Sequence, residues 1–404
     1  MALSCSPSSL IAAAKCLSCI PKSERRHVRA YLLCHWAAGS GGGGSIPGTP
    51  TGFAWAMTHL SAVASWNVPP TGVTATELWL STDGVTYVLA ETIPAPGSVS
   101  SQNFMLANPY YAKIRWVNGA LNGPFTASLS VTFGAYWSAR VVANGGAAPA
   151  AGSVAAVDAL AVGFIADGIM NKTVYTLGFT NDNLIAALTP IFFATGNDPA
   201  TNVNFVLADL TVNGLFGDGA TKYLKLGFSV ADLINEFVAP TVYSEISFAA
   251  YVSANNTGLW VDTGAATVLA GNDEWGALVY DNAGLTHYFC PYNGGANDLI
   301  WVNPDGVVNT LWLFNRTSVN NANIWYGAAG PTKKVTDAVN VGATVPTARE
   351  IYAFCMNNAG APSFISGRRY SAMWWGGGLS DALAPLMGPR LRTFRTSIGG
   401  GNPG

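Results

Sequence analysis

The side chains best suited to metal binding stand together near the start of the sequence. They supply four nitrogen or sulfur donors: Cys16, Cys19, Cys34 and His35. This spacing can close a tetrahedral zinc site, and such a site would stabilise a segment too short to fold alone. Two other interpretations stay open, a disulfide from Cys34 to Cys16 or Cys19 and the plain packing of small apolar thiols. Packing is the interpretation we adopt, so we predict no metal and no other cofactor.

Carboxylates for sugar chemistry are a second resource. Glycoside hydrolysis needs two carboxylates held at a fixed separation across a sugar. The nearest pair is Asp273 and Glu274, but neighbouring residues of a strand point to opposite faces of a sheet. Histidine, on which acid–base catalysis draws most often, occurs only four times. We therefore predict that the chain is not an enzyme and has no catalytic residues, with a glycan-degrading enzyme as the alternative.

Aromatic side chains are the third resource, and many of them lie in the C-terminal half near turns rich in Asn, Asp and Gly. Sugar recognition pairs an aromatic ring with polar side chains and amides. The candidate glycan contacts are Trp275, Tyr292, Asn293, Asn297, Asp298 and Trp301. Core packing is the alternative interpretation for most aromatic residues in this half.

The composition of the chain excludes several classes of protein. Hydrophobic residues make up 50% of the 404 residues and charged residues only 10%, against about 25% charged in an ordinary soluble domain. A disordered chain is therefore excluded. The formal charge of −2 gives no general electrostatic reason to bind nucleic acid or an anionic membrane. We therefore predict no nucleic-acid partner. Because no stretch of about 20 apolar residues occurs, we also predict no membrane insertion.

Residues 1–38 form a distinct basic segment ahead of a Gly/Ser/Pro linker over residues 39–50. Apolar spacing and the break at Pro21 predict two short helices, arranged as a helical hairpin. A hairpin of this length cannot bury enough surface to be stable alone, so we expect it to dock on an acidic partner. The residues predicted to dock this anchor module are Lys15, Lys22, Arg25, Arg26, Arg29 and Tyr31.

Period-two alternation begins after the linker and predicts a β-sandwich over residues 51–134. Strand-like segments alternate around Trp66 and Trp79, and Asp83-Gly84 predicts a hairpin turn. Trp66 ahead of two prolines, together with segments 77–87, 110–115 and 123–126, resembles a fibronectin type III repeat. The resemblance implies a spacer that presents a neighbouring domain.

Residues 135–398 contain many short aromatic strand-like segments framed by two predicted helices. Ser153 can cap a helix that runs to Ala166, and a second helix is predicted from Leu379 to Thr396. Segments 217–224, 314–319, 352–357 and 368–380 resemble the concanavalin/laminin-G-like jelly roll. The predicted fold is mainly β: an N-terminal helical hairpin, an Ig/fibronectin III-like sandwich and a concanavalin A-like jelly roll with flanking helices, before a Gly-rich tail over residues 399–404.

Two segments of the anchor module, 14–22 and 30–36, resemble a short N-terminal module of bacteriophage structural proteins. In those proteins the module precedes fibronectin-like and laminin-G-like domains. The resemblance implies a tail fibre or spike on the exposed virion surface, joined through residues 1–38 to capsid or tail proteins. It also implies a symmetric homo-oligomer, a trimer, whose head binds a host-surface glycan. A capsid decoration or head-fibre protein and a cellular adhesin are alternatives.

Overall fold

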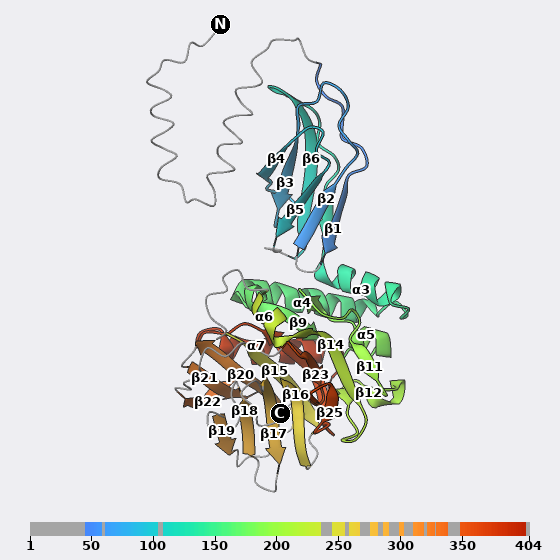
Figure 1. Cartoon of the computed structure of the whole chain (residues 1–404). Helices are drawn as coiled ribbons and strands as arrows, with labels where there is room; N and C mark the ends of the chain where they lie inside the picture. Colours follow the sequence, from blue (N-terminus) through green and yellow to red (C-terminus); the bar gives the residue numbers. More distant parts are fainter. Residues whose placement is uncertain are drawn as a thin grey trace, which may run out of the picture.

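The computed structural model describes residues 45–58, 61–103, 108–235, 245–254, 258–266, 275–281, 286–290, 299–302, 310–318, 321–327, 329–337 and 348–400. The prediction of a mainly β chain with few helices is confirmed (Figure 1). The anchor module, the first part of the linker and the tail from residue 401 lie outside the described residues. The N-terminal helical hairpin therefore stays a prediction.

Two antiparallel sheets form a first body, here called the small sandwich (Figure 1). Its strands are β1 (Ala54–Thr58), β2 (Ser61–Ser65), β3 (Ala75–Ser81), β4 (Val88–Pro94), β5 (Val99–Asn103), β6 (Tyr110–Asn118), β7 (Leu121–Asn122) and β8 (Leu129–Val131). One sheet has the order β1-β2-β5 and the other β4-β3-β6-β7, with β8 also paired to β6. Alternation turns Leu78 and Ile114 inward, where they belong to one buried cluster with Trp55 and Trp66.

Two helices follow the small sandwich in the sequence: α3 (Phe133–Ala143) and α4 (Ala151–Asp167). The hydroxyl of Thr132 accepts a hydrogen bond from the backbone N–H of Ala135 and so caps α3. The predicted domain boundary after residue 134 falls inside this helix. Ser153 does not cap the next helix, because α4 begins two residues earlier and Ser153 is buried inside it.

The rest of the described chain forms a larger body of two sheets. The inner sheet contains β9 (Thr173–Leu177), β10 (Phe192–Phe193), β12 (Leu210–Thr211), β13 (Gly214–Phe216), β15 (Ser247–Ala254), β20 (Thr310–Ser318), β21 (Asn321–Tyr326), β22 (Thr332–Asp337) and β26 (Arg369–Gly376). The outer sheet contains β11 (Thr201–Val203), β14 (Tyr223–Ser229), β16 (Gly258–Ala266), β17 (Trp275–Asp281), β18 (Thr286–Cys290), β19 (Leu299–Val302), β23 (Glu350–Ala353), β24 (Met356–Asn358) and β25 (Ala361–Ser363). The helical segments are α5 (Leu184–Leu188), α6 (Val230–Asn235), α7 (Ala384–Ser397), η1 (Met170–Lys172) and η2 (Leu207–Asp209).

Strand order places the main core of the larger body between these two sheets. The inner sheet runs β10-β9-β26-β15-β20-β21-β22, and the outer sheet runs β11-β14-β23-β16-β17-β18-β19. Phe248, Phe314 and Trp375 of the inner sheet share one buried cluster with Leu226 and Ile351 of the outer sheet. Burial of this much apolar surface is the main stabilising contribution to the larger body.

The helices α4 and α7 cover the other face of the inner sheet (Figure 1). Phe164 of α4 and Leu391 of α7 belong to a second buried cluster with Trp374, and this cluster continues into the small sandwich. The helical layer thus joins the two bodies. Helix α7 begins at Ala384 rather than at Leu379 as predicted, with Pro385 in the first turn, where a missing N–H costs no helical hydrogen bond. Among the described residues, no helix combines the length and the apolar character that crossing a membrane requires.

Candidate functional site

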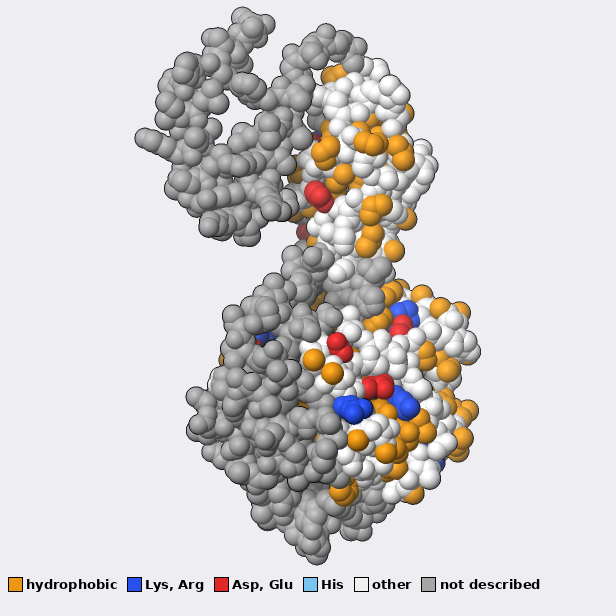
Figure 2. Space-filling view, viewed as in Figure 1, with side chains coloured by type: hydrophobic (Ala, Val, Ile, Leu, Met, Phe, Trp, Pro, Cys, Tyr) orange, Lys and Arg blue, Asp and Glu red, His pale blue; other side chains and the backbone are white. Residues whose placement is uncertain are grey.

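A polar groove of about 390 Å³ lies at one end of β14 and β23, in the outer sheet. Its volume falls within the range of about 300–1,000 Å³ that is typical of small-molecule sites. Figure 2 shows acidic and basic side chains close together over this part of the larger body. We call it the β14–β23 groove, and its polar lining comes mainly from Asn197, Thr201, Lys225, Ser229, Asp232 and Glu350.

Strand alternation builds the outward face beside the groove. In β14, Leu226 belongs to the core between the sheets, so Tyr223 and Lys225 face outward. Strand pairing sets Lys225 beside Thr201 of β11 on one side and beside Tyr352 of β23 on the other. Three neighbouring strands therefore bring one lysine, one hydroxyl and one aromatic ring into a single row.

An aromatic pair borders this row. The rings of Tyr223 and Tyr352 stack with their centroids 5.3 Å apart and their planes at 27°. Tyr223 is half-buried and Tyr352 is nearly covered. The Lys225 ammonium lies 5.7 Å from the centroid of the Tyr352 ring, within the range in which a ring face attracts a cation. Burial, together with the nearby Glu350 carboxylate, raises the pKa of Tyr352 to about 12, so its hydroxyl stays neutral at pH 7.

A glycine shapes the β14 side of the groove. Gly227 has a φ of +76°, and the pairing of β14 with β23 shifts register in this part of the strand. A Cβ at this position would lie 2.2 Å from Oδ1 of Asn197, so the site requires glycine. The Asn197 backbone N–H donates to the carbonyl of Leu226 at 2.6 Å, and its side-chain amide donates to the Thr201 hydroxyl at 3.0 Å. The loop that carries Asn197 is thus tied to β14 at the groove.

Two carboxylates line the groove, and the backbone holds one oxygen of each. Oδ2 of Asp232 accepts hydrogen bonds from the N–H of Ser229 at 2.7 Å and from its hydroxyl at 2.8 Å. Oε1 of Glu350 accepts from the N–H of Gly227 at 2.7 Å. From the described residues, Oδ1 of Asp232 and Oε2 of Glu350 receive no hydrogen bond. Each carboxylate therefore keeps one acceptor oxygen for a ligand.

Hydrogen-bond donors face the same groove. Lys225 forms no ion pair with any described carboxylate, so its ammonium keeps its donor protons. The Thr201 hydroxyl accepts a hydrogen bond from Asn197 and retains its own proton to donate. The groove can thus accept from and donate to a ligand that carries many hydroxyl groups.

The loop ahead of β11 is also fixed from the helical layer. Arg140 of α3 is 8% exposed and forms an ion pair with Asp198, with its Nη1 3.1 Å from Oδ2. The rings of Tyr136 and Phe193 lie 4.7 and 4.5 Å from the Arg140 guanidinium. Since Asp198 directly follows Asn197, this buried contact positions one wall of the groove.

Only two of the six predicted glycan contacts fall within the described residues. Trp275 is fully buried between the sheets, so the prediction that its ring contacts a glycan is wrong, because the register of β17 turns the ring into the core. Trp301 is placed as a backbone position of β19. The others lie outside the described residues: Tyr292, Asn293, Asn297 and Asp298.

The remaining predicted residues also lie outside the described part of the chain. They are the zinc candidates Cys16, Cys19, Cys34 and His35, the docking residues Lys15, Lys22, Arg25, Arg26, Arg29 and Tyr31, and the acidic pair Asp273 and Glu274. Within the residues that the structure describes, no three His, Cys, Asp or Glu side chains come together as a metal site needs. Cys355 is buried, and burial raises the pKa of its thiol.

Sequence reasoning missed the β14–β23 groove. The alternation of Tyr223 and Lys225 with leucines is a local signal for an outward strand face, and it could have pointed to these two residues. Glu350 contacts Gly227 across 123 positions of the chain, and no local pattern reports such a contact.

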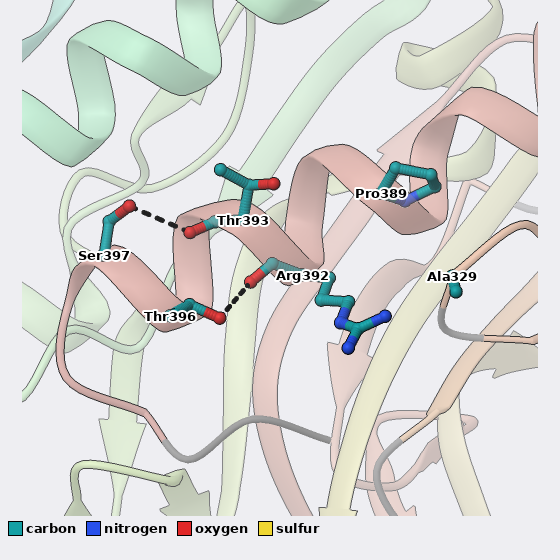
Figure 3. Close-up of a pocket in the computed structure, with 6 residues that line it drawn as sticks. All are labelled: Ala329, Pro389, Arg392, Thr393, Thr396 and Ser397. Atoms are coloured by element: carbon teal, nitrogen blue, oxygen red, sulfur yellow. Dashed lines mark hydrogen bonds between the residues drawn. The ribbon is translucent and has the colours of Figure 1, made fainter. Parts of the chain in front are cut away.

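A second hollow, of about 380 Å³, lies along α7 (Figure 3). Two of its hydroxyl groups serve the helix itself, because Thr396 donates to the carbonyl of Arg392 at 3.0 Å and Ser397 donates to the carbonyl of Thr393 at 2.9 Å. Each bond runs back to the carbonyl four positions earlier, a common use of Ser and Thr hydroxyl groups within a helix. The described residues that line this hollow include neither an aromatic ring nor a carboxylate, and we therefore place the candidate site in the β14–β23 groove.

No protein family model and no curated protein matches the chain. Similar solved structures are fibronectin type III β-sandwich domains, and the similarity covers about 22% of the chain. A two-domain fibronectin type III segment of chicken tenascin is 20% identical over 22% of this chain and 51% of its own length, with a TM-score of 0.20. An Fn3-like protein from Clostridium thermocellum is 21% identical over 21% of this chain and 92% of its own, with a TM-score of 0.20. The chain thus spans about half the length of the tenascin segment.

Proposed function

We propose that this chain is a non-enzymatic display protein whose larger body binds glycans through the β14–β23 groove. The observation that carries the proposal is the lining of the groove, where the open oxygens of Asp232 and Glu350 stand with Lys225. Beside the groove, the Lys225 ammonium lies over the ring of Tyr352, which stacks on Tyr223. A saccharide offers an apolar C–H face, which packs on an aromatic ring, and hydroxyl groups, which need donors and acceptors at its edge. The groove supplies the donors and acceptors, and the aromatic pair borders it beside Lys225.

The class of display protein that we propose is a bacteriophage virion protein, a fibre or spike anchored by its N-terminus. The resemblance of segments 14–22 and 30–36 supports this placement. The order of a small sandwich before a larger two-sheet body suits a fibronectin type III-like spacer and a concanavalin/laminin-G-like jelly roll. In this proposal the chain is a homotrimer on the exposed virion surface, and residues 1–38 join it to capsid or tail proteins. A capsid decoration or head-fibre protein is the alternative position.

A glycan-degrading enzyme is the second candidate, and the two carboxylates in one groove favour it. Glycosidases place two carboxyl groups about 5–10 Å apart on either side of the scissile bond. In the groove, however, Asp232 and Glu350 each commit one oxygen to a backbone N–H. Such fixed carboxylates suit the binding of hydroxyl groups.

One assay separates binding from cleavage. The full chain is incubated with immobilised envelope polysaccharide, and both retained protein and released soluble sugar are measured. The proposal expects retained protein and no sugar release above a blank without protein. Sugar release that Asp232→Asn and Glu350→Gln both abolish would establish the enzyme instead. The absence of both retention and release would contradict both candidates.

A second experiment addresses the virion placement. An antibody against the larger body is used to label purified particles, and incorporation of the full chain is compared with that of a variant lacking residues 1–38. The proposal expects surface label that disappears with the deletion, while the deleted chain remains folded by circular dichroism. Unchanged incorporation of the deleted chain would contradict anchoring through this module.

A further inference from the structure

We propose that the β14–β23 groove selects neutral saccharides over saccharides that carry carboxylate, phosphate or sulfate groups. This inference rests on the proposed glycan binding and adds the class of glycan. It follows from the charged side chains among the described residues that line the groove, which are Asp232, Glu350 and Lys225. Two negative charges thus face one positive charge.

The open carboxylate oxygens set what the groove can recognise. Oδ1 of Asp232 and Oε2 of Glu350 can only accept hydrogen bonds, and neighbouring hydroxyl groups of a sugar can donate to them. A ligand carboxylate or sulfate at pH 7 offers acceptors alone. Placed against Asp232 or Glu350, it would leave both partners without a donor and would add like-charge repulsion.

Lys225 does not reverse this balance, because it is a single ammonium drawn toward the aromatic pair. Lys222 and Asp209 are nearby but do not line the groove, and they pair with each other: the Lys222 ammonium lies 2.6 Å from the Asp209 carboxylate. Arg349 is exposed next to Glu350, but it does not line the groove and has an interaction of its own. The charges that a ligand meets on the described lining of the groove are therefore net negative.

Calorimetry with two matched probes tests the selection. The probes are a neutral hexose oligosaccharide and the same oligosaccharide with one hexose oxidised to the uronic acid, each titrated into the full chain at pH 7. We expect the uronate to bind about tenfold more weakly at low salt, and we expect the gap to narrow as salt screens the charges.

Isosteric amides locate the effect. The double variant Asp232→Asn/Glu350→Gln keeps an oxygen for each backbone N–H and removes both charges, so it should bind the uronate at least as tightly as the neutral probe. The control is Asp381→Asn, which removes an exposed carboxylate paired with Lys333 outside the groove. This control should leave the ratio of the two affinities unchanged.

The results distinguish the selection for neutral saccharides from the glycan binding on which it rests. Equal or tighter uronate binding by the unmodified chain would overturn the selection and leave glycan binding intact. If the chain binds neither probe and is retained on no polysaccharide in the retention assay, both the selection and the proposed glycan binding would be overturned. If the ratio of the two affinities is the same in the folded double variant as in the unmodified chain, Asp232 and Glu350 do not set that ratio. This result would overturn their assignment as the selecting groups.

Discussion

The carboxylate of Asp158 in α4 accepts a hydrogen bond from the side-chain amide of Asn108 at 2.8 Å, and this contact joins the small sandwich to the helical layer. The same oxygen accepts from the backbone N–H of Gly134 at 2.8 Å. Oδ1 of Asn108 in turn accepts from the N–H of Phe133 at 2.9 Å. Two side chains thus fix the start of α3 against α4 and against the loop before β6.

Removal of this acceptor should weaken the joint between the bodies. We expect Asp158→Ala to lower the free energy of unfolding by about 1–3 kcal/mol, because the buried N–H of Gly134 and the amide of Asn108 lose their shared partner. Asp158→Asn retains one oxygen and should lose less. Urea denaturation measures both variants. Equal losses would mean that the acceptor oxygen is not the stabilising group.

The groove should depend on the glycine in β14. Gly227→Ala places a Cβ 2.2 Å from Oδ1 of Asn197 at a φ of +76°, so we expect it to cost about 1–3 kcal/mol of stability. Adding Asn197→Ala removes the side-chain part of the clash, while the backbone N of residue 197 stays 2.7 Å from the added Cβ. The second substitution should therefore restore part of the loss, a coupling that a double-mutant cycle of denaturation curves detects. Strictly additive effects would argue against contact between the two side chains. Gly72→Ala, at a φ of +92° with nothing within 4 Å of the added Cβ, controls for backbone strain alone.

A buried acid in the outer sheet should give the stability a specific pH dependence. Asp262 accepts a hydrogen bond from the Tyr370 hydroxyl and lies 3.4 Å from the Arg368 guanidinium. Burial raises the pKa of Asp262 above its ordinary 3.8, against the opposing effects of Arg368 and Tyr370. Protonated Asp262 therefore contributes its full stabilisation of the folded state below pH 3.8. This contribution is lost as the pH rises through the pKa that Asp262 has in the folded state.

The variant Asp262→Asn isolates this contribution. The stability of the unmodified chain relative to Asp262→Asn should fall as the pH rises above 3.8. Denaturation curves of both chains across the acid and neutral range give the difference at each pH. Subtraction cancels other carboxyl groups such as Asp218, whose pKa is lowered because hydrogen bonds from Thr221 and the neighbouring backbone outweigh its burial. A difference that does not change with pH would contradict the raised pKa.

Local patterns predicted local elements well. The Asp83-Gly84 turn forms as expected, with Gly84 at a φ of +73° and the Asp83 carboxylate accepting from the N–H of Val85 at 2.8 Å. The apolar face predicted for α4 is also buried, as Leu160 and Phe164 show. In each case the interacting residues lie within four positions, so the sequence itself contains the information.

Features set by distant contacts were not predictable in the same way. The start of α3 depends on Asn108, which lies 25 positions before Phe133. The inward direction of Trp275 follows from its pairing with Ala265 across a β-hairpin, although its neighbours in the sequence suggested an exposed turn. The β14–β23 groove requires Glu350 to meet Gly227, and strand order alone brings them together.

Glycan binding at the β14–β23 groove is best tested by the affinity of the full chain for envelope polysaccharide, compared between the unmodified protein and Tyr223→Ala. Loss of the stacking ring should weaken binding about three- to tenfold. The matched control is Tyr87→Ala, which removes a half-buried tyrosine of the small sandwich whose ring lies 3.9 Å from the Lys113 ammonium. We predict weaker binding for Tyr223→Ala and unchanged binding for Tyr87→Ala, whereas equal affinities for all three proteins would contradict a binding role for the groove.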